Sequence, residues 1–245
     1  MTVPRQLGVV YGATLLWLLV VPALPEIAKA DVATLAAGIP ALILLTGCAL
    51  VLIPLRNATA ALILLALGGG MLGAGLTEVG ADAGADITKA LFASSVGFLL
   101  VRVLSTPAVV IAVPLLISAI DIFSVLSGPS AALMRDESGV SDFLTFTIPA
   151  FGGGHAGALG ISDIIFCAFF AGCAWRYGLR RRSTTVALLL ALPAALILAV
   201  ATSRGVAALP FLSVALLLPN LDLLPRLLST GSGRRPDGEI ASVGN

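Results

Sequence analysis

Charged residues are scarce in this sequence. They make up 11% of the 245 residues, whereas a soluble domain carries about 25%. Histidine occurs once and cysteine three times, which leaves too few residues for a histidine-rich metal site or a disulfide framework. The chain is instead 58% hydrophobic, with a mean hydropathy of +1.08. These values exclude a soluble globular domain, a disordered chain and a basic nucleic-acid-binding protein. We therefore predict an all-α, multi-pass membrane protein in contact with the lipid bilayer.

The apolar residues form continuous runs and do not alternate with polar residues, so they favour transmembrane helices over a β-barrel. Each run is close to the length of roughly 20 residues that spans a bilayer. A helix break is expected at Thr106-Pro107, because the residue before proline disfavours the helical conformation. The first run is longer than the apolar segment of a signal peptide, so we predict that it stays as a helix. Eight spans are predicted, at about 7–25, 32–54, 58–77, 88–104, 106–127, 156–177, 185–202 and 205–224.

The basic residues predict the orientation of these helices. With the N-terminus inside, ten Lys and Arg fall on the inner side and four, including Lys29 and Lys89, on the outer side. This distribution follows the positive-inside rule and places both termini in the cytoplasm, in a cell membrane. The longest loop, about 128–155, is then external. We divide the chain into N-terminal transmembrane helices (1–105), a transmembrane catalytic half (106–227) and a cytoplasmic tail expected to be disordered (228–245).

Two carboxylates, Asp121 and Asp163, lie inside predicted spans, away from the helix ends. An ionisable residue within a membrane span is costly and indicates a functional site. Each lies about seven residues from the outer end of its helix, which is roughly 10 Å at 1.5 Å per residue. The two helices are consecutive and antiparallel, so the carboxylates are expected at matched depth. No Lys or Arg is predicted near that depth.

Three interpretations of this pair are open from the residues alone. Two adjacent carboxylates hold one proton between them, as in aspartic proteases, where one member activates water and the other polarises the scissile carbonyl. The same residues also suit a proton-coupled transporter. Alternatively, each aspartate caps a broken helix or binds a neighbouring serine.

The residues around the aspartates resemble the presenilin and signal peptide peptidase family of intramembrane aspartyl proteases. Residues 117–126 (ISAIDIFSVL) are similar to the first catalytic helix of that family, 159–166 (LGISDIIF) to its Gly-x-Gly-Asp helix, and 207–210 (AALP) to its Pro-Ala-Leu motif. The resemblance covers roughly 110–220, and the residue bias towards Ala, Leu, Gly and Arg is typical of a divergent prokaryotic member. It implies a helical bundle with a presenilin-like C-terminal half. It also implies no metal or organic cofactor.

By this resemblance Asp121 and Asp163 are the catalytic pair, and the substrates are transmembrane segments or leftover signal peptides. The external loop and cytoplasmic C-terminus match the orientation of signal peptide peptidase. Pro210 has no backbone N–H and suits a site that pairs with an extended peptide. The residues that the resemblance makes substrate-binding or site-shaping are Gly160, Ile161, Ser162, Ala208, Leu209 and Pro210.

Three positions depart from the family pattern: Ile120 replaces Tyr, Ser162 replaces Gly and Ala207 replaces Pro. The first removes a hydroxyl from the site, and the second adds a side chain where the backbone approaches closely. A non-catalytic member that binds transmembrane helices is therefore an alternative to the protease, besides the transporter. The sequence does not indicate the oligomeric state.

Two glycine-rich segments match G-x-G-x-x-G without the strand-turn-helix context of a nucleotide site. Residues 68–73 instead predict a close helix-packing surface. Residues 152–154 predict a flexible hinge ahead of the Asp163 helix.

Overall fold

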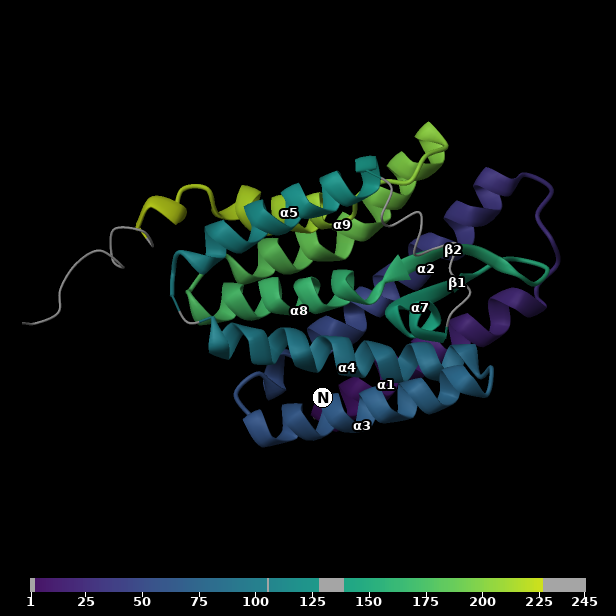
Figure 1. Cartoon of the computed structure of the whole chain (residues 1–245), viewed down its shortest axis with the longest axis horizontal. Coiled ribbons are helices and arrows are strands. Elements are labelled where there is room, and N and C mark those ends of the chain that lie inside the picture. Colours follow the sequence, from purple (N-terminus) through teal and green to yellow (C-terminus); the bar gives the residue numbers. More distant parts are fainter. Residues whose placement is uncertain (1–2, 105, 128–138, 227–245) are drawn as a thin grey trace, which may run out of the picture.

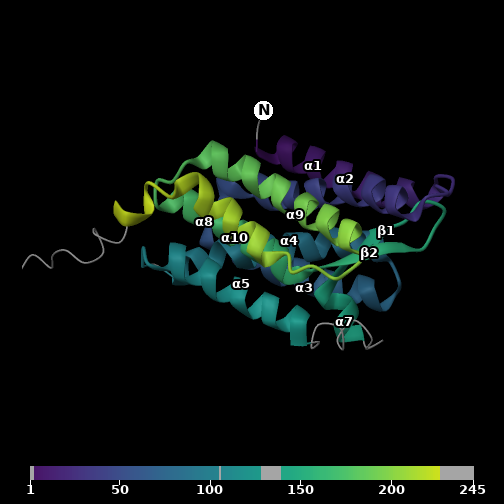
Figure 2. The same cartoon turned by 90° about the horizontal axis from the view of Figure 1, so that it is seen from above.

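The computed structural model describes residues 3–104, 106–127 and 139–226. Helices dominate these residues and form a bundle, to which a two-stranded hairpin is attached at one end (Figures 1 and 2). The long elements are α1 (Val3–Val20), α2 (Ala30–Val51), α3 (Thr59–Glu78), α4 (Asp82–Val103), α5 (Val109–Ser127), α8 (Ile161–Arg176), α9 (Arg181–Thr202) and α10 (Leu209–Leu217). The short elements are η1 (Val21–Ala23), η2 (Ile53–Leu55), α7 (Gly139–Leu144), β1 (Thr145–Pro149), β2 (His155–Gly160) and η3 (Leu218–Asn220).

A helix is present within each of the eight predicted spans, and the break at Pro107 separates α4 from α5. In the described part of the chain, six of the helices are long and apolar enough to cross a membrane. The other two, α8 and α10, are shorter, with 16 and 9 residues. All-α character is therefore confirmed for the bundle. A membrane-spanning role for α8 and α10 stays a prediction.

The start predicted for the sixth helix is wrong. Residues 156–160 belong to strand β2, which pairs antiparallel with β1, and α8 begins only at Ile161. Gly157 and Gly160 disfavour a helix here, while β1 carries the β-branched residues that favour a strand. Asp163 consequently lies in the first turn of its helix, whereas seven residues were expected between it and the helix end.

The glycines at 152–154 also act differently from the prediction. All three have positive φ values, between 79° and 96°, and they form the turn between β1 and β2. Only glycine adopts this conformation without strain. Strand β2 lies between this turn and α8, so these glycines are not the hinge of the Asp163 helix. Residues 128–138 of the predicted external loop and the predicted tail at 228–245 are outside the described residues.

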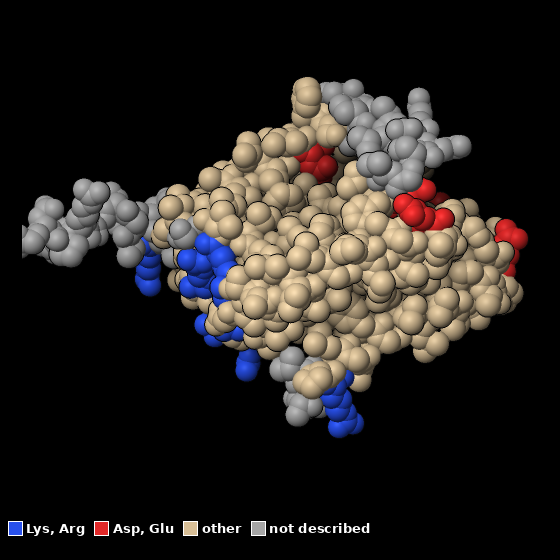
Figure 3. All heavy atoms as spheres, turned by 60° about the horizontal axis from the view of Figure 1, so that its bottom comes forward, with Lys and Arg blue, Asp and Glu red and all other residues tan. Residues whose placement is uncertain are grey.

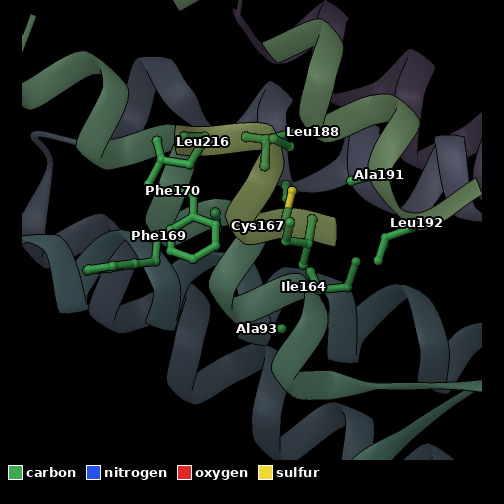
Figure 4. Close-up of a cluster of buried hydrophobic side chains, with 14 of the residues drawn as sticks. Ala93, Ile164, Cys167, Phe169, Phe170, Leu188, Ala191, Leu192 and Leu216 are labelled. Carbon is green, nitrogen blue, oxygen red and sulfur yellow. The ribbon is translucent and has the colours of Figure 1, made fainter. Parts of the chain in front are cut away.

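The hydrophobic core lies between α2, α4, α8, α9 and α10. Figure 4 shows the α8 side chains of Ile164, Cys167, Phe169 and Phe170 among residues of these neighbours. All four are fully buried. Helix α8 is thus the central helix of this part of the bundle, although it is shorter than α4 and α9.

Glycines allow α4 to approach two neighbours closely. A Cβ on Gly69 of α3 would lie 2.9 Å from the Thr88 backbone oxygen, which confirms the predicted packing surface. On α4 itself, a Cβ on Gly97 would lie only 2.3 Å from the Ile165 backbone oxygen of α8. Gly172 of α8 is similarly close to Val101. The α4–α8 seam, defined by Gly97 and Gly172, therefore depends on residues without side chains.

Charges separate along the bundle. Arg102 and Arg176 lie in the last turns of α4 and α8, whereas Asp31 and Asp82 lie in the first turns of α2 and α4. The face in Figure 3 shows basic side chains mainly towards one end and acidic ones towards the other. This is the separation that the predicted topology requires.

We predict that Gly97→Ala destabilises the protein by about 1–3 kcal/mol, because the new methyl group has no room against α8. The matched control is Gly68→Ala on α3, where a Cβ meets nothing within 4 Å. That change is expected to stabilise α3 by up to about 1 kcal/mol through helix propensity. Thermal unfolding of the detergent-purified variants measures both. Equal shifts in the two variants would contradict a tight α4–α8 seam.

Candidate active site

Asp121 belongs to a polar stripe on an otherwise apolar helix. Pro114, Ser118 and Asp121 follow one another on α5 at helical spacing, so they share one face. The opposite face exposes large apolar side chains, including Phe123 and Leu126. Exposure of this kind is expected where a helix faces lipid. The polar stripe turns towards α10, on which α5 packs.

The Asp121 carboxylate receives hydrogen bonds from the beginning of α10. The Leu209 backbone N–H donates to Asp121 Oδ2 at 3.0 Å, and the Ala208 backbone N–H donates to the same carboxylate. The first N–H groups of a helix have no partner within the helix. Pro210, the next residue, has no N–H to satisfy. Asp121 therefore completes the N-terminus of α10, and the Ala-Leu-Pro segment lies directly against it.

Two serines add a second polar contact between these helices. Ser118 Oγ donates to Ser213 Oγ at 2.8 Å, and Ser213 Oγ donates to the Pro114 backbone oxygen at 3.0 Å. Leu209 and Ser213 are one helical turn apart, as are Ser118 and Asp121, so the two pairs are in register. Sequence analysis assigned no role to these serines. The spacing that they share with Asp121 and Leu209 is the signal that could have identified them.

Asp163 lies at the N-terminus of α8 and belongs to the helix that it caps, whereas Asp121 caps a neighbouring helix. It is the third residue of the helix and is 8% exposed. The Gly160 backbone N–H, at the position that precedes the helix, donates to its carboxylate. A hydrogen bond from the N-cap backbone N–H to the side chain of the third helical residue is one of the two hydrogen bonds of a capping box. Each aspartate thus accepts N–H groups at the N-terminus of a short helix.

The structure brings the two aspartates together. Asp121 lies close enough to Asp163 for their charges to interact, and α10 packs against both α5 and α8. The side chains come from antiparallel helices, as Figure 1 shows. Neither aspartate belongs to either of the two ion pairs in the described residues. The result is a pair of carboxylates with backbone donors around it and no cation paired with it.

The remaining predicted site residues occupy different environments. Ile161 and Leu209 are buried in the core, so only their backbone atoms are available to the site. Gly160, Ala208 and Pro210 are half-buried, and Ser162 is exposed. A Cβ on Gly160 would lie 3.2 Å from Ser162 Oγ, a tight contact, and 3.5 Å from Asp163 Oδ2, an ordinary one.

The three positions that depart from the family pattern lie beside the pair. Ile120 is 58% exposed on α5, and Ala207 is half-buried just before α10. Ser162 is exposed, next to Asp163.

A second ionic site was missed by sequence analysis. Helix α4 begins six residues earlier than predicted, at Asp82, so Asp86 and Lys89 are inside a helix and not in an outer loop. Their side chains form a buried ion pair at 2.7 Å. The i, i+3 spacing of opposite charges could have revealed it once the helix was extended.

This ion pair holds the hairpin. Lys89 Nζ donates to the backbone oxygens of Asp142 and Thr145, at 3.1 and 2.5 Å. Asp86 Oδ2 accepts the Thr147 backbone N–H at 3.0 Å. Both partners therefore satisfy backbone groups of the segment that leads into β1.

An apolar groove follows the side of β2 that faces α9. Its volume is about 400 Å³, and it extends to Ala208 beside Asp121. Gly157 and Ala158 are exposed along it. In the described residues β2 pairs only with β1, so its second edge has no partner strand. This combination provides space and free backbone groups next to the aspartate pair.

The described residues contain no group of three or more His, Cys, Asp or Glu side chains that could hold a metal ion. The three cysteines are buried and unpaired, as expected for small apolar residues. Comparison of the chain with protein-family models, curated proteins and solved structures gave no match.

We predict that Lys89→Met destabilises the protein by about 3–5 kcal/mol, because it leaves the buried Asp86 carboxylate without its cation. The control is Lys29→Met, which removes the only other lysine, an exposed one. Thermal unfolding in detergent compares them. Similar melting temperatures for the two variants would show that the hairpin is held in another way.

Proposed function

We propose that this protein is an intramembrane aspartic endopeptidase in which Asp121 and Asp163 form the catalytic pair. The observation that carries the proposal is the meeting of two carboxylates from antiparallel helices, without a cation paired to them in the described residues. Two carboxylates whose charges interact without a compensating cation favour a state in which they hold one proton between them. The resemblance of the flanking residues to the presenilin and signal peptide peptidase family supports the same assignment.

In this mechanism the pair holds one proton. The ionised carboxylate takes a proton from a water molecule, whose oxygen attacks the carbon of the scissile peptide bond. The protonated carboxylate donates its proton to the carbonyl oxygen as the tetrahedral intermediate forms. Collapse of the intermediate breaks the C–N bond, and the amine leaves with a proton returned from the pair. No metal or cofactor takes part.

The groove beside β2 supports binding of an extended substrate. A substrate strand adding to the free edge of β2 would make main-chain hydrogen bonds there, with its small side chains against Gly157 and Ala158. Its path leads to Ala208, next to Asp121. We propose transmembrane segments or leftover signal peptides as substrates, in the orientation of signal peptide peptidase. That orientation rests on the positive-inside rule, with both termini cytoplasmic.

One observation favours a second candidate, a non-catalytic member that binds transmembrane helices. Both carboxylates accept N–H groups at helix N-termini, a role that stabilises the fold without any reaction. Asparagine still offers a side-chain oxygen to those N–H groups. Asn variants of the two aspartates are therefore expected to fold, and they separate the structural role from the chemical one.

The proposal predicts that a photoreactive inhibitor with a hydroxyl in place of the scissile carbonyl labels the purified protein. Such a group imitates the tetrahedral intermediate and binds more tightly than substrate. Asp121→Asn and Asp163→Asn should each abolish labelling, and each should reduce cleavage of a transmembrane peptide by about 10²–10⁴-fold. Asp31→Asn, at an exposed position at the start of α2, is the control and should change neither.

Folded protein that takes no label would rule out the paired aspartyl site. Measurement of proton or solute flux in proteoliposomes would then distinguish the transporter, in which flux depends on the same aspartates, from a binding protein without flux.

A further inference from the structure

A basic cavity lies at the end of the bundle opposite the hairpin. Its volume is about 460 Å³. Three arginines from three different segments line it: Arg56 follows η2, Arg102 ends α4 and Arg176 ends α8. Trp175 and Asn57 add polar groups. Because Asp121 and Asp163 are not among the lining residues, this cavity is separate from the candidate active site.

The three arginines are not neutralised by carboxylates within the described residues, where the ion pairs are Asp86–Lys89 and Arg180–Asp222. They bind backbone oxygens instead. Arg56 Nη1 donates to Ile53 at 3.1 Å, and Arg176 Nη1 donates to Val101 at 2.6 Å. A guanidinium has five N–H donors. Arg56 and Arg176 therefore keep positive charge and further donors for a ligand.

Arg102 holds the wall of the cavity together. Its guanidinium donates to the backbone oxygens of Arg56 and Asn57 and to the Thr59 hydroxyl. These contacts tie the end of α4 to the segment between α2 and α3. The positions of two arginines are thus linked, and the cavity is built before any ligand arrives.

Trp175 provides a rigid surface inside this charged region. The guanidinium carbons of Arg56 and Arg181 lie 4.6 and 4.2 Å from the centroid of its ring, which is cation–π geometry. Its indole Nε1 is buried and has no hydrogen-bond partner in the described part of the chain. A buried donor without a partner is costly.

The remaining wall is apolar and is formed by Phe98, Val101 and Gly172. Phe98 and Val101 are buried and pack against Gly172 at the α4–α8 seam, so they expose little apolar surface to the cavity. Most of the accessible lining is polar. The arginines therefore determine what the cavity binds.

We propose that this cavity binds a phosphate group, held by Arg56 and Arg176 with Trp175 beside them. Guanidinium groups bind phosphate through paired N–H donors, and the charge of the three arginines balances an anion. A phospholipid with an anionic headgroup and a small soluble phosphate share this chemistry. Basic pockets between membrane helices are known to recognise anionic headgroups, which makes the phospholipid the expected ligand.

The test uses the fluorescence of Trp175 to measure binding in the cavity. The chain has two tryptophans, Trp17 and Trp175, so a Trp17→Phe background leaves Trp175 as the only one. Its fluorescence is titrated in neutral detergent with phosphatidylglycerol, phosphatidylcholine, glycerol 3-phosphate and inorganic phosphate. We expect a saturable change with phosphatidylglycerol. Arg56→Gln and Arg176→Gln should each raise its half-saturation concentration about five-fold.

Arg182→Gln is the matched control. It removes the same charge at the same end of the bundle, from an exposed residue that does not line the cavity. Saturable binding of the soluble phosphates without the lipid would support the site and assign its ligand as a free phosphate. Equal weakening by Arg182→Gln, equal binding of phosphatidylcholine, or no saturable change with any probe would overturn the proposal.

Two measurements keep the result independent of folding. Thermal unfolding is recorded for each variant, and Arg176→Gln, at an exposed position, serves if Arg56→Gln does not fold. Native mass spectrometry of the unsubstituted chain counts retained phosphatidylglycerol without using fluorescence. Loss of retained lipid in Arg176→Gln but not in Arg182→Gln is the expected outcome, and retention by both would again overturn it.

Discussion

The buried ion pair between Asp86 and Lys89 is the interaction on which the candidate site depends. An ion pair removed from water is stable only when further hydrogen bonds satisfy it, and here the backbone of the hairpin segment supplies them. Through a series of contacts, this ion pair also affects the position of Asp163. Lys89 holds Thr145, Thr145 is opposite Gly160 in the hairpin, and Gly160 donates to Asp163. A contact on α4 thus positions the residue at which α8 begins.

The second constraint is that buried helix ends must satisfy their own backbone groups, because apolar surroundings offer no hydrogen bonds. Both α8 and α10 begin at a carboxylate that accepts their first N–H groups. Placing acidic groups at two helix N-termini is also electrostatically favourable. The same geometry that completes these helices brings Asp121 and Asp163 together. The structural role and the proposed chemical role therefore belong to the same two residues, and only a change that preserves one role can separate them.

The features predicted from sequence are those determined by local composition. Long apolar runs specify helices wherever they occur, so the positions of the helices and the break at Pro107 could be predicted. The two intramembrane aspartates were found because a charge within an apolar run is conspicuous. Their actual contacts could not be predicted, because Leu209 follows Asp121 by 88 residues and only the packing of α10 on α5 brings them together.

The hairpin was missed for a related reason. Residues 156–160 are small or apolar, so their composition resembles the start of a membrane helix, and their strand conformation depends on pairing with β1. Lys89 and Asp86 were assigned to a loop because charge normally marks the end of a membrane span. Asp86 and Lys89 depart from that rule because they are buried within the bundle. Their burial depends on the hairpin, which covers them. Both errors therefore have one origin, a tertiary contact between α4 and the segment before α8.

The α4–α8 seam relates the two ends of the molecule. Asp163 and Arg176 lie near opposite ends of α8, about 20 Å apart at 1.5 Å per residue. Gly97 and Gly172 allow α4 to pack along this length without intervening side chains, and closely packed interiors transmit displacement instead of absorbing it. Because α4 and α8 pack closely along this length, the two helices form one unit. Helix α4 carries the ion pair at one end of this unit and Arg102 at the other. The position of the basic cavity relative to the aspartate pair is consequently set by backbone packing.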